Sequence, residues 1–183
     1  GGIIGYENSW KNQEGKTNTF RNVSNSGHIT GRIYVGGLAG RLAAANMDQV
    51  RNTGRIEQQT VKFINKYGYS DQVKSYFIGG IAGAIGPEGE AAKGVRISHA
   101  YNGGTIGVDT SKDGYYDRGW YIGGIVGTLS GHYEGADWKS THTYGAQGSI
   151  IDYAHNTGTI TAGFENVGGI VGFTTGLGKE NEG

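Results

Sequence analysis

Five short segments of the chain share one pattern: two glycines, two aliphatic or small residues, and a third glycine. They read GGIIG, GGLAG, GGIAG, GGIVG and GGIVG, and they begin at Gly1, Gly36, Gly79, Gly123 and Gly168. Glycine at this density disfavours a helix, whereas the aliphatic residues between the glycines are unusual in a loop. Such repetition indicates an array of similar structural units.

Composition narrows the class of fold. The chain has 183 residues, of which 37 are glycine and one is proline, whereas glycine makes up about 7% of an average protein. Abundant glycine with so little proline argues against collagen and proline-rich linkers. The 12 tyrosines argue against disorder. We therefore expect an all-β fold, with residues 1–183 forming a single repeat domain.

A second motif alternates with the glycine segments and reads FRNVSNSGHI, MDQVRNTGRI, ISHAYNGGTI and IDYAHNTGTI. In each copy, glycine follows asparagine by two residues and isoleucine follows by four. The asparagines are Asn25, Asn52, Asn102 and Asn156. This spacing predicts a turn, because asparagine bonds its own backbone and glycine takes left-handed dihedral angles freely. The isoleucine should begin the next strand.

Stacked units would place equivalent positions of the motifs in columns, and each unit would bury its apolar face against the next. Four columns are expected: Ile29, Ile56, Ile106 and Ile160; Phe20, Met47, Ile97 and Ile151; Ile3, Leu38, Ile81, Ile125 and Ile170; and Val35, Ile78, Ile122 and Val167. The asparagines would form a further column, in which their amides bond as a ladder. These columns predict a β-solenoid of about four and a half repeats; the alternative is a β-sandwich, whose short strands would also carry turn signals.

The glycine segments themselves are expected to be strands that are buried on both faces. In the segment 78–85, Ile81 and Ile85 would lie on one face of the strand, and Ile78, Ala82 and Ala84 would lie on the other. Glycine weakens a strand but allows the backbone of a neighbour to approach closely.

The repeats are separated by insertions of variable length. Successive glycine segments begin 35, 43, 44 and 45 residues apart, and the shortest unit is 27 residues. The insertions, at about 58–75, 107–119 and 130–148, should be surface loops. The chain begins inside a glycine segment and ends soon after the last one, without a polar capping repeat. We therefore expect a fragment of a longer protein, with flanking repeats or domains as partners, or self-association through the solenoid ends.

The alternation of GGLAG-type with NTGTI-type segments resembles the GLUG repeat, most closely at 36–40 and 156–160. The resemblance covers nearly the whole chain. It implies an extracellular location on the bacterial cell surface and a structural or adhesive role. Such repeats occur in adhesins similar to filamentous haemagglutinin and in the non-catalytic parts of immunoglobulin A peptidases. The resemblance assigns no catalytic residue and does not explain the tyrosine-rich insertions.

One insertion resembles the front of a calcium-binding loop. Its oxygen ligands would be the side chains of Asp109, Ser111, Asp113 and Asp117 and the main-chain carbonyl of Tyr115, with Gly114 at the sharp turn. Trp120 stands where such loops place a bidentate glutamate. A loop rich in side-chain-to-backbone turns is the alternative, and calcium is the one cofactor that the sequence suggests.

Aromatic residues of the insertions are candidates for ligand binding, namely Tyr116, Trp120, Tyr133 and Trp138. Exposed tyrosine and tryptophan offer flat, rigid contact surfaces to a glycan or a host protein. Alternatively, these rings cover the outer apolar face of the glycine segments.

The remaining features favour a protein that is not an enzyme. Sixteen basic residues balance 16 acidic residues, which gives no reason to expect a nucleic-acid partner. Cysteine is absent, and His99 and His155 are expected to point outward from different columns. A non-catalytic structural or adhesive segment is therefore the first hypothesis. The alternatives are a self-assembling filament subunit and a glycan-acting β-helix enzyme, with Glu134 and Asp137 as its nearest carboxylate pair.

Overall fold

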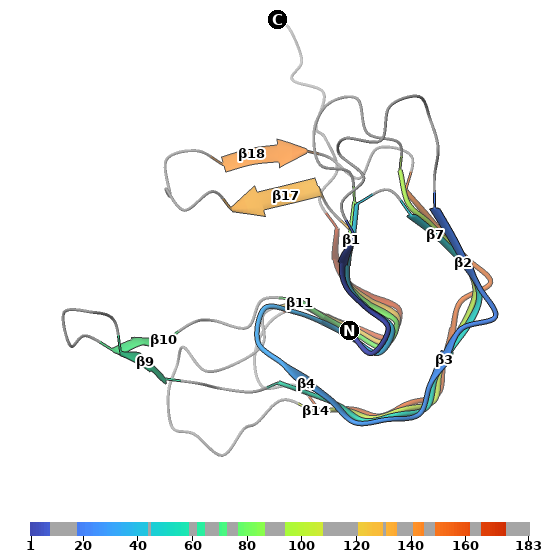
Figure 1. Ribbon diagram of the computed structural model, residues 1–183, viewed down its shortest axis with the longest axis horizontal. Helices are drawn as coiled ribbons and strands as arrows, with labels where there is room; N and C mark the ends of the chain where they lie inside the picture. The colour runs from blue at the N-terminus through green and yellow to red at the C-terminus, as the bar shows by residue number, and fades with distance from the viewer. Residues whose placement is uncertain are drawn as a thin grey trace, which may run out of the picture.

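The computed structural model describes residues 1–7, 18–43, 45–58, 62–64, 70–72, 77–86, 94–107, 121–129, 131–134, 141–144, 149–161 and 166–174. All regular elements within these residues are β-strands. Most of the strands belong to four parallel sheets, which are seen end-on in Figure 1. The all-β prediction is therefore confirmed. We name each sheet after one of its central strands.

The β12 sheet and the β7 sheet face each other across the larger hydrophobic core. The β12 sheet contains, in order, β1 (Ile4–Glu7), β6 (Ala39–Leu42), β12 (Ala82–Ile85), β16 (Val126–Leu129) and β23 (Val171–Thr174). The β7 sheet contains β2 (Asn18–Arg21), β7 (Ala45–Asn52), β13 (Arg96–Asn102) and β19 (Ile150–Asp152), and the short strands β3 (Ser24–Asn25) and β20 (His155–Asn156) pair with β7 and β13.

The other two parallel sheets enclose a smaller core. The β8 sheet contains β4 (Ile29–Gly31), β8 (Ile56–Gln58), β14 (Ile106–Gly107) and β21 (Ile160–Thr161). The β11 sheet contains β5 (Tyr34–Gly36), β11 (Phe77–Gly79), β15 (Tyr121–Gly123) and β22 (Val167–Gly168).

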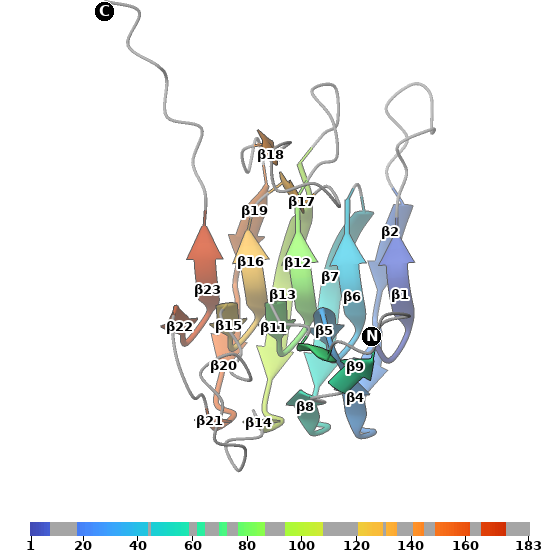
Figure 2. The ribbon, with the colours of Figure 1, turned by 90° about the vertical axis from the view of Figure 1, so that its left-hand side faces the viewer.

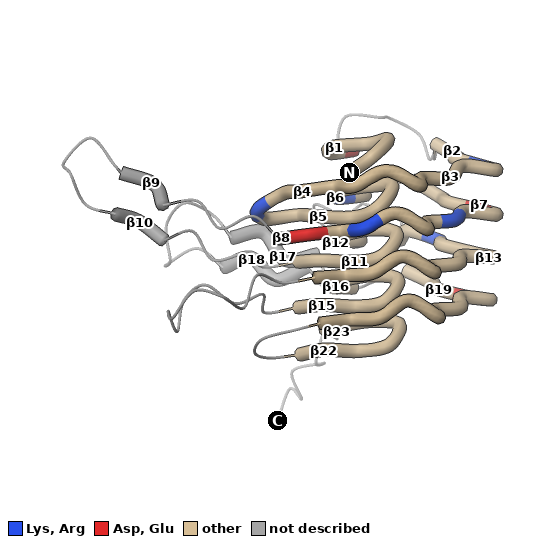
Figure 3. The backbone as a smooth tube through the Cα atoms, turned by 90° about the horizontal axis from the view of Figure 1, so that it is seen from below, with Lys and Arg blue, Asp and Glu red and all other residues tan. Residues whose placement is uncertain are grey.

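The chain visits these sheets in a fixed order: the β7 sheet, the β8 sheet, the β11 sheet and then the β12 sheet. Each pass, called a rung below, adds a strand beside the strand of the previous pass, so that the rungs lie in sequence order from one end of the molecule to the other (Figures 2 and 3). In the part of the chain that is described, four rungs follow the single strand β1.

Two of the three predicted insertions contain β-hairpins that are separate from the parallel sheets. Strands β9 (Lys62–Ile64) and β10 (Ser70–Gln72) pair antiparallel, as do β17 (Gly131–Glu134) and β18 (Thr141–Tyr144). Each pair forms a two-stranded sheet of its own. The insertion at 107–119 lies outside the described residues from position 108 onward.

The pairing register confirms the predicted columns. Ile56 is the partner of both Ile29 and Ile106, and Ile106 is also the partner of Ile160. Register partners also link the members of two further columns: Phe20, Met47, Ile97 and Ile151, and Val35, Ile78, Ile122 and Val167. In the fourth column, main-chain hydrogen bonds link Ile3, Leu38, Ile81, Ile125 and Ile170. Equivalent positions of successive repeats therefore lie one above another.

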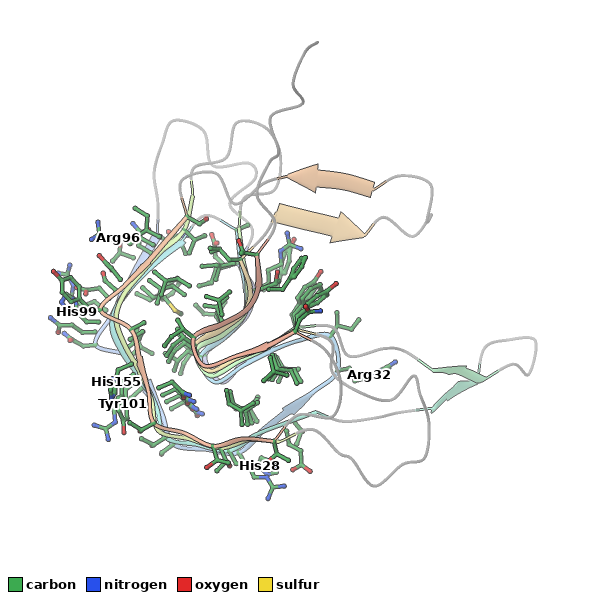
Figure 4. All side chains as sticks on the ribbon, turned by 180° about the vertical axis from the view of Figure 1, so that it is seen from behind. His28, Arg32, Arg96, His99, Tyr101 and His155 are labelled. Carbon is green, nitrogen blue, oxygen red and sulfur yellow. The ribbon has the colours of Figure 1, made fainter. Side chains whose placement is uncertain are left out.

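The prediction of a single strand over 78–85 is wrong. The segment bends at Gly80 and Ile81, which separate β11 from β12, so its two halves belong to different sheets. Its side chains accordingly divide between the two cores, which Figure 4 shows in cross-section. Ile81 and Ile85 lie in the larger core, together with Ala82, whereas Ile78 lies in the smaller one. The whole segment is buried, as expected.

The left-handed conformation that the sequence suggests for the glycines of the asparagine motif is wrong, whereas the close backbone approach expected at the glycine segments is confirmed. Gly86 is the one described glycine in the left-handed region, with φ of 147°. The glycines of both motifs are needed because neighbouring rungs approach so closely. A Cβ at Gly80 would lie 2.5 Å from Cγ of Asn102 and would overlap the carbonyl oxygen of Gly124, and a Cβ at Gly54 would overlap that of Gly27.

The asparagines form the expected ladder beside these glycines. Nδ2 of Asn25 donates to Oδ1 of Asn52 at 2.9 Å, Asn52 donates to Asn102 at 2.8 Å, and Asn102 donates to Asn156 at 2.8 Å. Each amide also makes two hydrogen bonds with the backbone of the glycine two residues later, at 3.1 to 3.3 Å. Asn52 and Asn102 are completely buried, and with four hydrogen bonds each their amides use their usual donors and acceptors in full.

A candidate binding face on the β7 sheet

The side of the β7 sheet that points away from the core carries a continuous set of polar and aromatic side chains. Buried and more exposed residues alternate along β7 except at Asp48 and Gln49, where two solvent-facing residues follow each other, so that Met47 and Val50 both face the core while Arg51 faces solvent. The surface is referred to as the outer face and consists of Arg21, Asn22, Ser24, Asp48, Gln49, Arg51, His99, Tyr101, Asp152, Tyr153, His155 and Thr157. Figure 4 labels three of these residues, and their side chains extend outward from the ribbon.

A corner in each rung directs one side chain far into solvent. The corner residues are Asn22, Gln49, His99 and Tyr153, whose φ angles are 57°, 55°, 49° and 49°. None of them is glycine, and a left-handed conformation costs such residues roughly 1–2 kcal/mol. The same backbone bend recurs in all four rungs because the packing of the apolar residues on either side imposes it. Tyr153, in the last of the four described rungs, is 76% exposed.

Charged and aromatic groups connect the corners of successive rungs. Asp48 accepts a hydrogen bond from Nε of Arg21 at 3.1 Å and lies 2.9 Å from Nδ1 of His99. The imidazole ring of His99 in turn stacks on the ring of Tyr153, with centroids 4.9 Å apart and an interplanar angle of 1°. The hydrogen bond to His99 is the main cause that lowers the pKa of Asp48 below its ordinary value of 3.8, and the charge of Arg21 acts in the same direction.

A second set of contacts runs beside the first. The guanidinium of Arg51 lies 4.8 Å from the ring centroid of Tyr101, a favourable cation–π distance. The ring of Tyr101 also stacks on His155, at 6.1 Å between centroids, and its hydroxyl lies 2.8 Å from Oγ1 of Thr157. Side chains from three rungs therefore hold one another in fixed positions, which lowers the entropy cost of using them in binding.

The outer face presents several groups that can take part in recognition. It offers aromatic rings as contact surface, and guanidinium, imidazole and phenol groups that can form hydrogen bonds with sugar hydroxyls or with polar protein surfaces. Among the residues whose positions are described, no three His, Asp or Glu side chains gather in a way that could hold a metal ion. The carboxylate of Asp152 is held by Arg96, and that of Asp48 by Arg21 and His99.

Most of the site residues predicted from sequence cannot be placed on this face or elsewhere. The calcium-loop candidates Asp109, Ser111, Asp113, Tyr115 and Asp117 lie outside the described residues. The same holds for Tyr116, Trp120, Trp138 and the alternative carboxylate Asp137. Tyr133 and Glu134 belong to β17, of which the backbone alone is described.

The histidine prediction is confirmed, because His99 and His155 both point outward from different columns. The sequence analysis missed Arg51, Tyr101 and Tyr153. A signal for them was available: once the buried positions of the asparagine motif are assigned, the positions between them must face solvent.

In comparisons with known proteins, no family model, no curated protein and no solved structure matches this chain. The resemblance to the GLUG repeat therefore remains a sequence-based expectation. Nowhere in the part of the chain that is described is there a helix of the length and hydropathy that crossing a membrane requires.

Proposed function

We propose that the chain is a β-solenoid segment of about four and a half repeats, and that it acts as a non-catalytic scaffold with an adhesive outer face. The observation that carries the proposal is the register of the four parallel sheets, in which every motif position pairs with the same position of the next repeat. A winding of this kind gives length and rigidity. The core positions of the motifs recur in each repeat, whereas the solvent-facing positions differ between repeats.

The resemblance to the GLUG repeat supplies the biological context of the proposal. On the strength of this resemblance, we propose that the scaffold belongs to an extracellular bacterial surface protein, with flanking repeats or domains of the same parent protein as its partners. The ligand of the outer face would then be a glycan or a host protein. Fixed aromatic rings next to guanidinium groups suit either partner, because they present rigid contact area with few rotatable bonds.

Binding of the purified chain to a glycan array and to immobilised host matrix proteins tests the adhesive role. A matched variant replaces outer-face residues by those that the first rung carries in the same columns: His99→Asn and Tyr153→Asn after Asn22, and Arg51→Ser and His155→Ser after Ser24. Asparagine tolerates the left-handed corner, so the circular dichroism spectrum should not change.

We expect the wild-type chain to bind and the matched variant to lose most of the binding. Equal binding by both proteins would remove the outer face from the proposal. If the wild-type chain binds nothing on either surface, the adhesive role fails and the scaffold role alone is left. Binding measured with calcium and with chelator tests the candidate loop at 109–117 in the same experiment, and release of free sugar would favour the glycan-acting alternative.

A further inference from the structure

Arg51 on the outer face has a guanidinium group that is held in position while its hydrogen-bond donors stay unused. The group lies over the ring of Tyr101, 4.8 Å from the ring centroid, and a cation–π contact of this kind consumes no N–H group. Among the residues that the structure describes, none accepts a hydrogen bond from the Arg51 side chain. The side chain is exposed, so its five N–H donors are available to a ligand.

Tyr101, which supports Arg51, is itself held on three sides. Its hydroxyl lies 2.8 Å from Oγ1 of Thr157, and its ring stacks on His155 (Figure 4). The ring also lies across the main chain of Gly103, where a Cβ would come within 2.7 Å of the tyrosine hydroxyl oxygen. The other three rungs carry serine or threonine at the position of Gly103. Glycine therefore occurs where the ring needs the room, and the support under Arg51 is rigid.

The charges around Arg51 leave it without an acidic partner. Three acidic side chains are described on the surface that runs from the β7 sheet to the β8 sheet, and each faces a different arginine: Asp48 faces Arg21 at 3.1 Å, Glu57 faces Arg55 at 3.3 Å, and Asp152 faces Arg96. The described part of this surface therefore keeps one uncompensated positive charge, which lies at Arg51. Such a charge favours a partner that brings an anionic group to this position.

Hydroxyl groups surround the guanidinium of Arg51. Ser24 is its register partner in the first rung, and Thr53 follows it by two positions on the same side of the chain. Both side chains are exposed, and their Cα atoms lie about 5 Å and about 7 Å from that of Arg51. Because serine is short, the side of the guanidinium that faces away from Tyr101 is open to a ligand.

Apolar groups lie farther away on the same sheet. Its exposed large hydrophobic side chains, Ile150 and Tyr153, belong to the last described rung, two rungs from Arg51. A protein partner binds mainly through apolar or aromatic anchors at the centre of its contact. A sugar uses its ring hydroxyls instead, which donate to and accept from groups such as Ser24 and Thr53. The surroundings of Arg51 therefore fit a sugar better than a protein.

We infer that Arg51 binds the anionic group of an acidic sugar. The carboxylate or sulfate of the sugar accepts two parallel hydrogen bonds from the guanidinium, and its hydroxyls bond to Ser24 and Thr53. The forked pair is the strong form of a charge-assisted hydrogen bond. This step depends on the adhesive role proposed above and selects a glycan as the partner. Ser24, Arg51, Tyr101 and His155 occupy successive rungs, so repeats before or after the chain would leave the neighbours of Arg51 unchanged.

Matched pairs of sugars test the requirement for a negative charge. Isothermal titration calorimetry compares sialyllactose with lactose, oligogalacturonate with its methyl ester, and dextran sulfate with dextran. We expect at least one acidic form to bind, and its neutral counterpart to bind about tenfold more weakly or less well still. The acidic form that binds identifies the anion as a carboxylate or a sulfate.

Variants at two exposed arginines test the role of Arg51. Arg51→Ser introduces the residue of the first rung, and Arg55→Thr introduces the residue of the third rung, so both should keep the circular dichroism spectrum. Each removes one positive charge, but the charge of Arg55 already faces Glu57. We expect R51S to weaken binding about tenfold or more and R55T to have little effect. R51K keeps the charge without the forked geometry and should still weaken binding.

The outcomes separate this ligand from the adhesive role. Absence of binding to every acidic probe, or equal binding of acidic and neutral forms, rules out the acidic sugar. Equal weakening by R51S and R55T would mean that net charge alone attracts the ligand, and equal affinity for polyglutamate would mean that the sugar is not recognised. If the array of the preceding section still shows binding to neutral glycans or matrix proteins, the adhesive role stands without the acidic sugar. A chain that binds nothing on either surface loses both.

Discussion

The asparagine ladder provides the most direct test of the stacked arrangement. Asn52 is completely buried. Its side chain makes four hydrogen bonds, which join it to Asn25, to Asn102 and to both main-chain groups of Gly54. The substitution Asn52→Ala removes all four and leaves each of the partners with one hydrogen bond fewer. With a net contribution of about 1 kcal/mol for each bond, we expect the free energy of unfolding to fall by about 4 kcal/mol.

Urea-induced unfolding, followed by far-ultraviolet circular dichroism, measures this change as a shift in midpoint at constant slope. Thr53→Ala is the matched control, because Thr53 lies in the same turn but is exposed. Its effect should stay within about 0.5 kcal/mol. A similarly small effect for Asn52→Ala would refute the ladder as a source of stability.

Asn52→Asp tests whether the ladder needs the hydrogen bonds that the Asn52 side chain donates as well as those that it accepts. A carboxylate can still accept from Asn25 and from the amide of Gly54, but it cannot donate to Asn102 or to the carbonyl of Gly54. At neutral pH this variant should be less stable than Asn52→Ala, because a buried charge faces two acceptors. Burial raises the pKa of such a carboxyl group. The variant should therefore regain stability relative to wild type as the pH falls through that raised pKa.

Three further predictions follow from other contacts. Gly80→Ala should destabilise the fold by several kcal/mol in the same urea experiment, since its Cβ would overlap the next rung, whereas Gly5→Ala has open space and should cost less than about 1 kcal/mol. The pKa of Asp48 is lowered from 3.8, so its contribution to stability is present above that pH and is lost as the pH falls through the folded-state value. Asp48→Asn should therefore flatten the acid limb of the stability curve below about pH 4, measured by thermal midpoints. Asn102 precedes Gly103, and an Asn-Gly dipeptide is prone to deamidation by attack of the glycine nitrogen on the asparagine side chain. Here the nitrogen of Gly103 donates to the carbonyl oxygen of Asn52 at 2.9 Å, and the side-chain amide of Asn102 is fixed in the ladder. Mass spectrometry should detect deamidation there in urea and not in the native chain.

Repetition made the columns predictable. A residue such as Ile106 must fit against Ile56 on one side and Ile160 on the other, so the three converge on one type, and the convergence is visible without a structure. The bend at Gly80 and Ile81 was not predictable in the same way. A segment that is apolar on both faces is equally consistent with one buried strand and with an arch between two cores.

The corner of each rung shows a different limit. Asn22, Gln49, His99 and Tyr153 share a left-handed backbone, yet only asparagine and histidine among them are enriched in that conformation. Local propensity gives no warning at Gln49 and Tyr153, because the bend is imposed by buried neighbours in adjacent rungs. The outer face was overlooked for a related reason: its residues vary between repeats, and an alignment of repeats draws attention to what does not vary.

The invariant and variable positions of the motif therefore carry different tasks. Glycine, asparagine and isoleucine recur because each must lie against its own kind in the rungs above and below, where a Cβ, a lost amide or a polar side chain would be costly. The solvent-facing columns escape this condition and change at every rung, as in the series Ser24, Arg51, Tyr101 and His155. Because no two rungs present the same outer surface, a partner of that face would meet one defined site on the chain. A repeating polymer bound in many equivalent registers would instead require an outer face that repeats as the core does.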